Sequence, residues 1–297
     1  MMDFSVVIPT HNRAELVART VAAFLAQGDA DFELIVVDDG STDNTTRRLQ
    51  QVNDGRLHLV QQENRGLAAA RNAGFALARR QYVLFNDDDI IPEPGFLGAH
   101  LELHRRFAHI AVVSRTQIPD SLGQDPFTRF WRARAENGVR GKSDAAALDR
   151  GGYWFASLSV ERAHLPADPF ASFPAYGWEE HELGLRLWKQ GIRPRLATRA
   201  RAAHEDRVNL EGMLTKFRSM GRMAWQFYRM HPSLEVALWT GANPISLIFK
   251  RWTYPWPRAE KILQERNWEQ GEGAESAYRF LLEAAYTQGL LEGRGAS

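Results

Sequence analysis

The acidic run Asp87-Asp88-Asp89 is the segment whose residue types and spacing most clearly suggest chemistry. It follows the apolar residues 82–85, so a buried strand would deliver three adjacent carboxylates to its carboxyl end. Adjacent carboxylates repel one another unless a cation lies among them. Mg²⁺ or Mn²⁺ would neutralise them and still leave positions for phosphate or water oxygens. The run alone equally allows a solvated acidic turn that caps the next helix.

A second polar segment, residues 38–43, follows the apolar run 32–37. Gly40 permits a tight turn, and one of the three residues after it can cap a following helix. That explanation leaves Asp38 and Asp39 unaccounted for, and an aspartate at a strand end can accept hydrogen bonds from a nucleobase N–H. We favour this nucleotide-binding interpretation.

A third polar segment, Pro9-Thr10-His11-Asn12-Arg13, follows the apolar run 4–8. His11 can stack on a base, although a lone histidine in a loop is more often simply exposed. No Gly-x-Gly-x-x-Gly pattern occupies this turn, which argues against a dinucleotide-binding oxidoreductase.

Residues 64–74 begin with Asn64-Arg65-Gly66 and continue into a run of small residues. The small side chains let a helix lie close to a sheet. They do not explain Arg71 or Asn72, and a guanidinium near a nucleotide can pair with a phosphate or with a carboxylate of the site.

Glu179 and Glu180 follow a glycine-tryptophan loop at the start of a predicted helix. The helix dipole accounts for one acidic residue there, and the other suits a general base. His204 follows a strand that we expect at a sheet edge, and its imidazole can complete a metal site, although an isolated histidine is usually structural. Trp154 and Trp178 can stack on an acceptor sugar, or belong to the core.

The elements that must position these residues alternate along the chain. Apolar, β-branched runs at 4–8, 32–37, 57–60, 82–85 and 110–113 are separated by stretches with helical spacing. This alternation predicts right-handed βαβ units and a mainly parallel sheet. Such sheets bind ligands at the carboxyl ends of their strands. The polar segments therefore share one edge, which favours the metal site over the solvated turn.

The rest of the chain is predicted to be less regular. Residues 116–174 suggest loops with one short strand near 154–160, and residues after about 205 have helical spacing. We expect two domains: residues 1–205, built on the sheet, and residues 206–297, a helical C-terminal extension.

Composition excludes several classes of protein. Lysine and arginine number 37 against 36 acidic residues, so no charge excess points to a nucleic-acid partner. The absence of cysteine excludes disulfides and thiolate sites and fits a cytoplasmic protein. No signal peptide or membrane-spanning run is visible. Residues 249–258 mix basic and aromatic side chains, which suits either a membrane surface carrying a lipid-linked acceptor or packing of the helical extension.

Taken in order, residues 7–13, 38–43, 64–74, 87–89 and Glu179-Glu180 closely resemble the family 2 inverting glycosyltransferases with the GT-A fold. The match covers about the first 205 residues. It implies a GT-A-like, Rossmann-type α/β sheet flanked by helices, a nucleoside-diphosphate sugar donor and a glycan or lipid-linked acceptor. It also implies a role in cell-envelope polysaccharide biosynthesis at the cytoplasmic side of the membrane.

The same resemblance implies roles for individual residues. Asp87 and Asp88 would meet the ribose and diphosphate, while Asp89, with His204, would bind Mn²⁺ or Mg²⁺. The other expected donor-binding residues are Pro9, Thr10, His11, Arg13, Asp39, Asn64, Gly66, Arg71 and Asn72.

Two positions depart from the family pattern. The family usually has Glu-Asp at Glu179-Glu180, so the base would be Glu180, with Glu179 as the fallback. The family often has Tyr at the position of His11, which weakens the expectation that His11 stacks on the base.

The expected reaction is a single in-line displacement at the anomeric carbon, in which Glu180 removes the acceptor proton and the sugar inverts. The alternatives are a non-catalytic nucleotide-sugar or glycan-binding module and a sugar nucleotidyltransferase. The latter typically has a glycine-rich basic loop after the first strand, where this chain has residues 9–13. An aspartate-nucleophile phosphatase would need companion motifs that we do not recognise.

Overall fold

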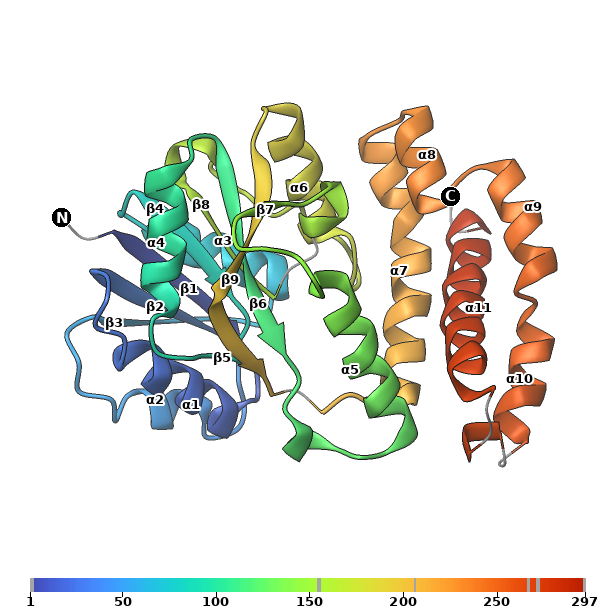
Figure 1. Cartoon of the computed structure of the whole chain (residues 1–297), viewed down its shortest axis with the longest axis horizontal. Helices are drawn as coiled ribbons and strands as arrows, with labels where there is room; N and C mark the ends of the chain where they lie inside the picture. Colours follow the sequence, from blue (N-terminus) through green and yellow to red (C-terminus); the bar gives the residue numbers. More distant parts are fainter. Residues whose placement is uncertain (1–2, 154–155, 206, 266–267, 271–272, 296–297) are drawn as a thin grey trace. The chain divides into compact units, whose positions relative to one another are not determined.

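The computed structural model describes residues 3–153, 156–205, 207–265, 268–270 and 273–295 (Figure 1). The chain forms two compact units. The sheet unit comprises Met1–Leu122, Glu136–Ser172 and Glu180–Asp206. The helical unit comprises Gly123–Ala135, Phe173–Glu179 and Arg207–Ser297.

The sheet has nine described strands in the order β3-β2-β1-β4-β8-β6-β9-β5, with β7 paired to β9. Their bounds are β1 Phe4–Thr10, β2 Phe32–Asp39, β3 Leu57–Gln62, β4 Tyr82–Asn86, β5 Ile90–Pro92, β6 Ile110–Gln117, β7 Ala146–Ala147, β8 Ser157–Glu161 and β9 Arg193–His204.

The sheet is mixed, and most of its paired residues belong to parallel ladders. β1 pairs in parallel with β2 and β4, β2 with β3, and β6 with β9. β8 is inserted antiparallel between β4 and β6, and β5 and β7 run antiparallel to β9. The predicted α/β class with a mainly parallel sheet is confirmed, and β8 is the short strand expected near 154–160, of which residues 154–155 lie outside the described residues.

The expectation of an edge strand before Ala200 is wrong. β9 lies between β6 and β5 and pairs with both of them. Its arginines occupy exposed or half-buried positions that alternate with buried ones such as Leu196 and Ala202. This alternation shows which face of the strand is exposed to solvent. It does not show whether the backbone of the strand is hydrogen-bonded to a neighbouring strand.

Helices cover both faces of the sheet, which explains why its strands are continuously apolar. Helices α1 (Ala14–Leu25), α2 (Thr45–Leu49) and α4 (Phe96–Arg106) pack on the face that contains Val6 and Ile8. Helices α3 (Leu67–Leu77) and α6 (Glu179–Lys189) pack on the face that contains Val7. Gly74 allows the close approach of α3, because a Cβ there would overlap the Val7 side chain.

The middle of the chain contains more helix than predicted. Helix α5 (Pro126–Val139) lies within the stretch expected to be loops, together with the short 3₁₀ turns η1 (Asp120–Leu122), η2 (Arg150–Tyr153) and η3 (Arg162–His164). Asp125 accepts a hydrogen bond of 3.0 Å from the Thr128 amide, and Pro126 opens the helix. An aspartate followed by proline is a helix-start signal that was readable in the sequence.

The C-terminal region is helical, as predicted. It consists of α7 (Leu210–Met230), α8 (Leu234–Thr240), α9 (Pro244–Thr253), α10 (Trp256–Gln264), the 3₁₀ turn η4 (Trp268–Gln270) and α11 (Ala274–Gly295). α7 and α11 lie side by side (Figure 1). In the part of the chain that the structure describes, no helix has both the length and the apolar character required to cross a membrane.

Candidate active site

The acidic run lies in a tightly held turn between β4 and β5. The Asp87 amide donates to the Ala156 carbonyl at 2.9 Å, and Asn86 Nδ2 donates to the carbonyls of Asp87 and Ile90 at 2.7 and 3.0 Å. Asp88 and Asp89 are only 7% and 6% exposed. The alternative of a solvated acidic turn is therefore wrong.

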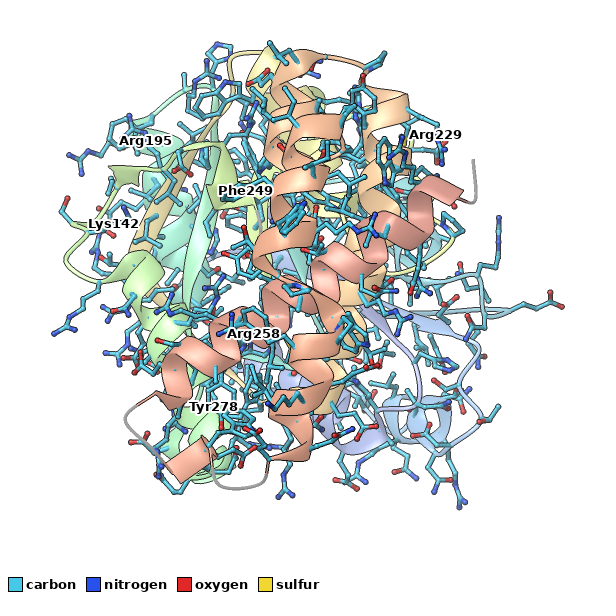
Figure 2. The ribbon with its side chains drawn as sticks, turned by 90° about the vertical axis from the view of Figure 1, so that its right-hand side faces the viewer. Lys142, Arg195, Arg229, Phe249, Arg258 and Tyr278 are labelled. Carbon is cyan, nitrogen blue, oxygen red and sulfur yellow. The ribbon has the colours of Figure 1, made fainter. Side chains whose placement is uncertain are left out.

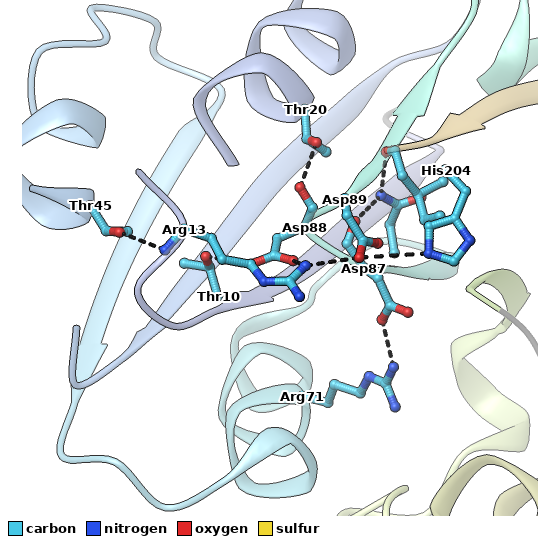
Figure 3. A network of polar contacts seen from close by, with 11 residues as sticks. Thr10, Arg13, Thr20, Thr45, Arg71, Asp87, Asp88, Asp89 and His204 are labelled. Atoms are coloured by element: carbon cyan, nitrogen blue, oxygen red, sulfur yellow. Dashed lines mark hydrogen bonds and ion pairs between the residues drawn. The ribbon is translucent and has the colours of Figure 1, made fainter. Parts of the chain in front are cut away.

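Arg13 spans the second and third carboxylates of the run (Figure 3). Its Nη1 lies 3.2 Å from Asp88 Oδ1 and 2.8 Å from Asp89 Oδ2. Thr10 Oγ1 donates to Asp88 Oδ2 at 2.7 Å, and Thr20 Oγ1 donates to the Asp88 carbonyl at the same distance. The end of β1 and the first helix thus hold Asp88 from two sides.

Backbone pairing brings Asp89 and His204 together. Ile90 pairs with His204 in the β5–β9 ladder, and the Glu205 amide donates to the Asp89 carbonyl at 2.8 Å. His204 Nε2 consequently lies 3.6 Å from Asp89 Oδ2 (Figure 3). Asp89 Oδ1 is buried and has no hydrogen-bond partner among the residues that the structure describes.

This pair suits a divalent cation that is shared with a bound ligand. No group of three or more carboxylate or imidazole side chains that could hold a metal ion occurs within the described ranges. One carboxylate and one imidazole are still a suitable protein contribution, because Mg²⁺ commonly takes its other oxygens from water and from substrate phosphates. The buried, unused oxygen of Asp89 is the acceptor that such a cation would satisfy.

The three carboxylates have different proton affinities. Burial raises the pKa of Asp87 to about 6, against the effect of Arg71, and raises the pKa of Asp88 to about 7, against the effect of Arg13. Burial acts on Asp89 in the same direction, but the hydrogen bond and charge of His204, together with Arg13, outweigh it and lower the pKa of Asp89 to about 2. Asp89 is thus the member most suited to bind a cation at neutral pH.

Arg71 joins the acidic run to helix α6. Its side chain is 1% exposed; Nη2 donates to Asp87 Oδ1 at 2.6 Å and Nη1 donates to Glu180 Oε1 at 2.9 Å. The guanidinium also lies over the ring of Phe170, 5.0 Å from its centroid. Arg71 was expected to pair with a phosphate or with a carboxylate, and its partners in the structure are the carboxylates of Asp87 and Glu180.

Asn72 holds the ring on which Arg71 lies. Its Nδ2 donates to the Phe170 carbonyl at 2.8 Å, and its Oδ1 accepts from the Phe170 amide at 2.9 Å. Both ends of the amide are thus bound within the protein, and Asn72 positions Phe170 beneath the guanidinium.

The two glutamates at the start of α6 have different surroundings. Glu179 Oε2 accepts a hydrogen bond of 3.1 Å from the Gly177 amide, which is the capping alternative considered for one of the pair. Glu180 is 7% exposed and binds Arg71. Gly177 and Trp178 have φ values of 124° and 77°, so the turn that leads into the helix uses backbone that is strained for tryptophan.

Asp39 organises the loop that precedes α3. Its Oδ1 accepts from the Arg65 amide at 2.9 Å and from Gln62 Nε2 at 2.6 Å, and its Oδ2 accepts from the Gly66 amide at 2.8 Å. A Cβ on Gly40 would lie 2.6 Å from the Asn64 amide nitrogen, so the two loops fit closely together. A carboxylate has further lone pairs, and the predicted contact of Asp39 with a nucleobase stays a prediction.

The loop after β1 is fixed by a residue that the sequence interpretation did not select. Asn12 has φ 54°, and its Oδ1 accepts from the Thr42 amide at 2.7 Å. His11 is exposed; its Nδ1 lies 2.9 Å from the Asp39 carbonyl oxygen, and Asn64 Nδ2 lies 3.3 Å from its Nε2. An asparagine at the start of a helix after a strand is the signal that could have identified Asn12.

Of the two tryptophans proposed to contact an acceptor, only Trp178 is among the described residues. Trp154 lies outside the described residues. Trp178 is 5% exposed, stacks on Phe227 with centroids 5.2 Å apart, and donates from Nε1 to the Met220 carbonyl at 2.8 Å. This is the core position that was the alternative for Trp178, and the acceptor role stays untested.

Comparison with known proteins identifies the family. Residues 5–159 match the family model described as Glycosyl transferase family 2. The chain is 31% identical over 281 residues to Validoxylamine A glucosyltransferase of Streptomyces hygroscopicus subsp. jinggangensis (strain 5008). This match covers 80% of the chain and spans 64% of the length of that relative.

Two further similarities are shorter or more distant. Succinoglycan biosynthesis protein ExoU of Rhizobium meliloti (strain 1021) is 40% identical over 99 residues, which are 32% of this chain and 29% of ExoU. The mannosyltransferase PcManGT from Pyrobaculum calidifontis, solved in complex with GDP-Man and Mn2+, has a TM-score of 0.57 at 18% identity. That match covers 96% of this chain and 86% of PcManGT and supports the fold. Because the family model spans more than half of its residues, the chain belongs to glycosyl transferase family 2.

Proposed function

We propose that the protein is an inverting, metal-dependent glycosyltransferase that moves a sugar from a nucleoside-diphosphate sugar to a hydroxyl acceptor. The observation that carries this proposal is the bridge from Asp87 through Arg71 to Glu180, beside the Asp89–His204 pair. A cation-binding carboxylate and a candidate base are thereby held at one sheet edge, as a displacement at a sugar carbon next to a diphosphate requires.

The donor site is proposed to form from the loops after β1, β2 and β4. Asp89 and His204 would hold Mn²⁺ or Mg²⁺, which when bound neutralises the charge on the departing diphosphate. Arg13 contacts Asp88 and Asp89, so its guanidinium can turn to a phosphate oxygen of the donor. Pro9, Thr10, His11, Asp39, Asn64 and Gly66 complete the proposed nucleotide-binding set.

Glu180 is proposed to accept the proton of the acceptor hydroxyl. Arg71 holds Oε1 of Glu180 and so orients its carboxylate without consuming it as a base. A single displacement by the hydroxyl inverts the sugar. The name of ExoU refers to succinoglycan biosynthesis, which supports a glycan as acceptor.

A thermal-shift screen of nucleoside diphosphates and their sugars, with and without Mn²⁺, tests the donor assignment. We expect stabilisation by one donor class that requires the metal, and its loss in Asp89→Ala. Sugar transfer or donor hydrolysis should then be absent in Glu180→Gln. A donor that binds but is never transferred or hydrolysed would instead indicate a binding module. Pyrophosphate release from a nucleoside triphosphate and a sugar phosphate would indicate a nucleotidyltransferase.

A further inference from the structure

Helix α9 exposes an apolar stripe. Ile245, Ile248, Phe249 and Trp252 recur at the spacing of one helical face and are 81%, 62%, 65% and 83% exposed. The residue that α9 buries is Leu247, which is 3% exposed. An amphipathic helix normally turns such a stripe toward a core, so α9 carries an apolar face in addition to the one it uses for folding.

Helix α8, which precedes α9 in the chain, exposes two further large apolar side chains. Leu234 and Leu238, one turn apart on α8, are 75% and 60% exposed. We call these six side chains the apolar surface: Leu234, Leu238, Ile245, Ile248, Phe249 and Trp252. Among the described residues, no other large hydrophobic side chain is more than 44% exposed. Such a concentration differs from the scattered apolar residues of ordinary surfaces and indicates an interaction site.

Positive charge gathers at α9 and the start of α10, whereas the exposed Glu235 lies next to Leu234 on α8. Residues 236–259 contain no aspartate or glutamate and three basic residues, Lys250, Arg251 and Arg258. Lys250 pairs with Glu283 at 2.8 Å, whereas Arg251 and Arg258 are exposed on α9 and α10. Figure 2 shows Phe249 and Arg258 on these two helices.

Residues 249–258 were interpreted either as packing of the helical extension or as a membrane contact, and the structure gives a different answer for different residues. Tyr254 and Trp256 pack against other residues of the helical unit, as the packing interpretation requires. Phe249 and Trp252 remain exposed. Packing of the helical unit therefore does not account for the aromatic residues of α9.

We propose that the apolar surface inserts into the interfacial layer of a membrane that contains anionic lipids. Apolar side chains with a tryptophan suit the boundary between acyl chains and headgroups, and a helix that carries basic and no acidic residues, as α9 does, suits anionic headgroups. A second copy of the chain fits less well, because a contact between two α9 helices would bring together two helices of the same positive charge. This proposal does not depend on the proposed reaction.

Vesicle flotation tests this proposal with the full chain. Vesicles of phosphatidylcholine and phosphatidylglycerol in equal parts should carry the protein upward, and phosphatidylcholine alone should carry less. The double variant Phe249→Ser/Trp252→Ser should lower the partition coefficient about tenfold or more. Arg251→Glu should lower binding to the anionic vesicles only. The matched controls, Leu77→Ser and Arg140→Glu on the sheet unit, should bind like the unmodified chain.

Two results would overturn the proposal. One is failure of the unmodified chain to float with anionic vesicles, or equal flotation of the double variant. The other is a dimer in light scattering without lipid that the double variant converts to a monomer, which would make the apolar surface a contact between copies. The variants change exposed residues, so unchanged thermal unfolding establishes that they are folded. Metal-dependent donor binding measured on the same samples separates a failure of this proposal from a failure of the proposed function.

Discussion

Arg71 donates a hydrogen bond of 2.9 Å to Oε1 of Glu180, and both side chains are buried. The second terminal nitrogen of the same guanidinium binds Asp87 at 2.6 Å. One cation therefore links the acidic turn after β4 to the start of α6, which are far apart in the chain. A planar guanidinium can hold two carboxylates in fixed directions, and an ammonium group cannot do so in the same way.

Replacing Arg71 with alanine should affect both folding and turnover. It leaves the buried Glu180 and the partly exposed Asp87 without their cation, and breaking a buried pair such as Arg71–Glu180 costs about 3–5 kcal/mol. Urea unfolding should show this loss, and the remaining folded enzyme should transfer sugar slowly. The matched control is Arg48→Ala, which removes an exposed pair with Glu15 and should change little. Equal effects of the two substitutions would contradict the role assigned to Arg71.

Substitutions of the two glutamates at the start of α6 should have different effects on sugar transfer. Glu180→Gln should lower kcat about 10²- to 10⁴-fold, because an amide cannot accept the acceptor proton. Donor affinity, measured by calorimetry, should change little. Glu179→Gln retains an oxygen that can accept from the Gly177 amide and should keep most of its activity. If the activities are reversed, Glu179 is the base.

The sheet, and the edge at which the candidate site residues gather, could be predicted because buried strands leave a local signal. Residues 4–8, 32–37 and 82–85 are apolar on both faces, and the structure makes them β1, β2 and β4. Parallel β1, β2 and β4 then necessarily bring their following loops to the same edge. This is why Thr10, Asp39 and the acidic run were correctly expected to be neighbours.

Contacts between distant segments could not be predicted in the same way. The antiparallel insertion of β8 and the pairing of β9 on both sides depend on strands that are separated by long connections. The internal partners of Asp39 and Asn72 are likewise backbone groups of other segments, and any sequence supplies those groups. The residue types therefore indicated that Asp39 and Asn72 belong to a candidate site, but they did not reveal which groups these side chains bind.

His204 should tune the metal requirement. The β5–β9 ladder places its imidazole beside Asp89, so His204→Ala removes one of two proposed protein ligands and leaves the sheet intact. The Mn²⁺ concentration that gives half-maximal activity should rise about tenfold or more. His109→Ala, at an exposed histidine, is the comparison. A metal titration that is the same in both variants would exclude His204 as a ligand.

The packing of α7 on α11 should be sensitive to single methyl groups. A Cβ on Gly221 would overlap the Tyr286 carbonyl oxygen, and a Cβ on Gly289 would overlap the Arg218 carbonyl oxygen. Backbone atoms cannot rotate away, so either alanine substitution should destabilise the chain by about 1–3 kcal/mol. Gly138→Ala in α5 adds the same methyl group where no atom lies within 4 Å. It should be neutral or stabilise by up to about 1 kcal/mol, and destabilisation equal to that of Gly221→Ala would contradict the close-packing argument.

Two buried histidines of α4 should make folding sensitive to acid. His100 Nδ1 lies 2.8 Å and His104 Nε2 2.7 Å from Ser159 Oγ, and His104 stacks on Tyr82 with centroids 4.3 Å apart. Burial is the main cause that lowers the pKa of each histidine from 6.5 to about 3. Below pH 6.5 the unfolded chain therefore binds two protons that the folded chain excludes.

The stability that these neutral histidines provide is fully present above pH 6.5 and is lost as the pH falls toward 3. Between about pH 6 and about pH 4 the pair should lower the free energy of unfolding by about 2.7 kcal/mol per pH unit. Urea unfolding across this range measures how the free energy of unfolding changes with pH. In His104→Gln this change per pH unit should be smaller by about half of that amount. His58→Gln, at an exposed position on β3, controls for the loss of a histidine from the chain. A slope for His104→Gln equal to that of the unmodified chain would show that burial does not hold His104 neutral.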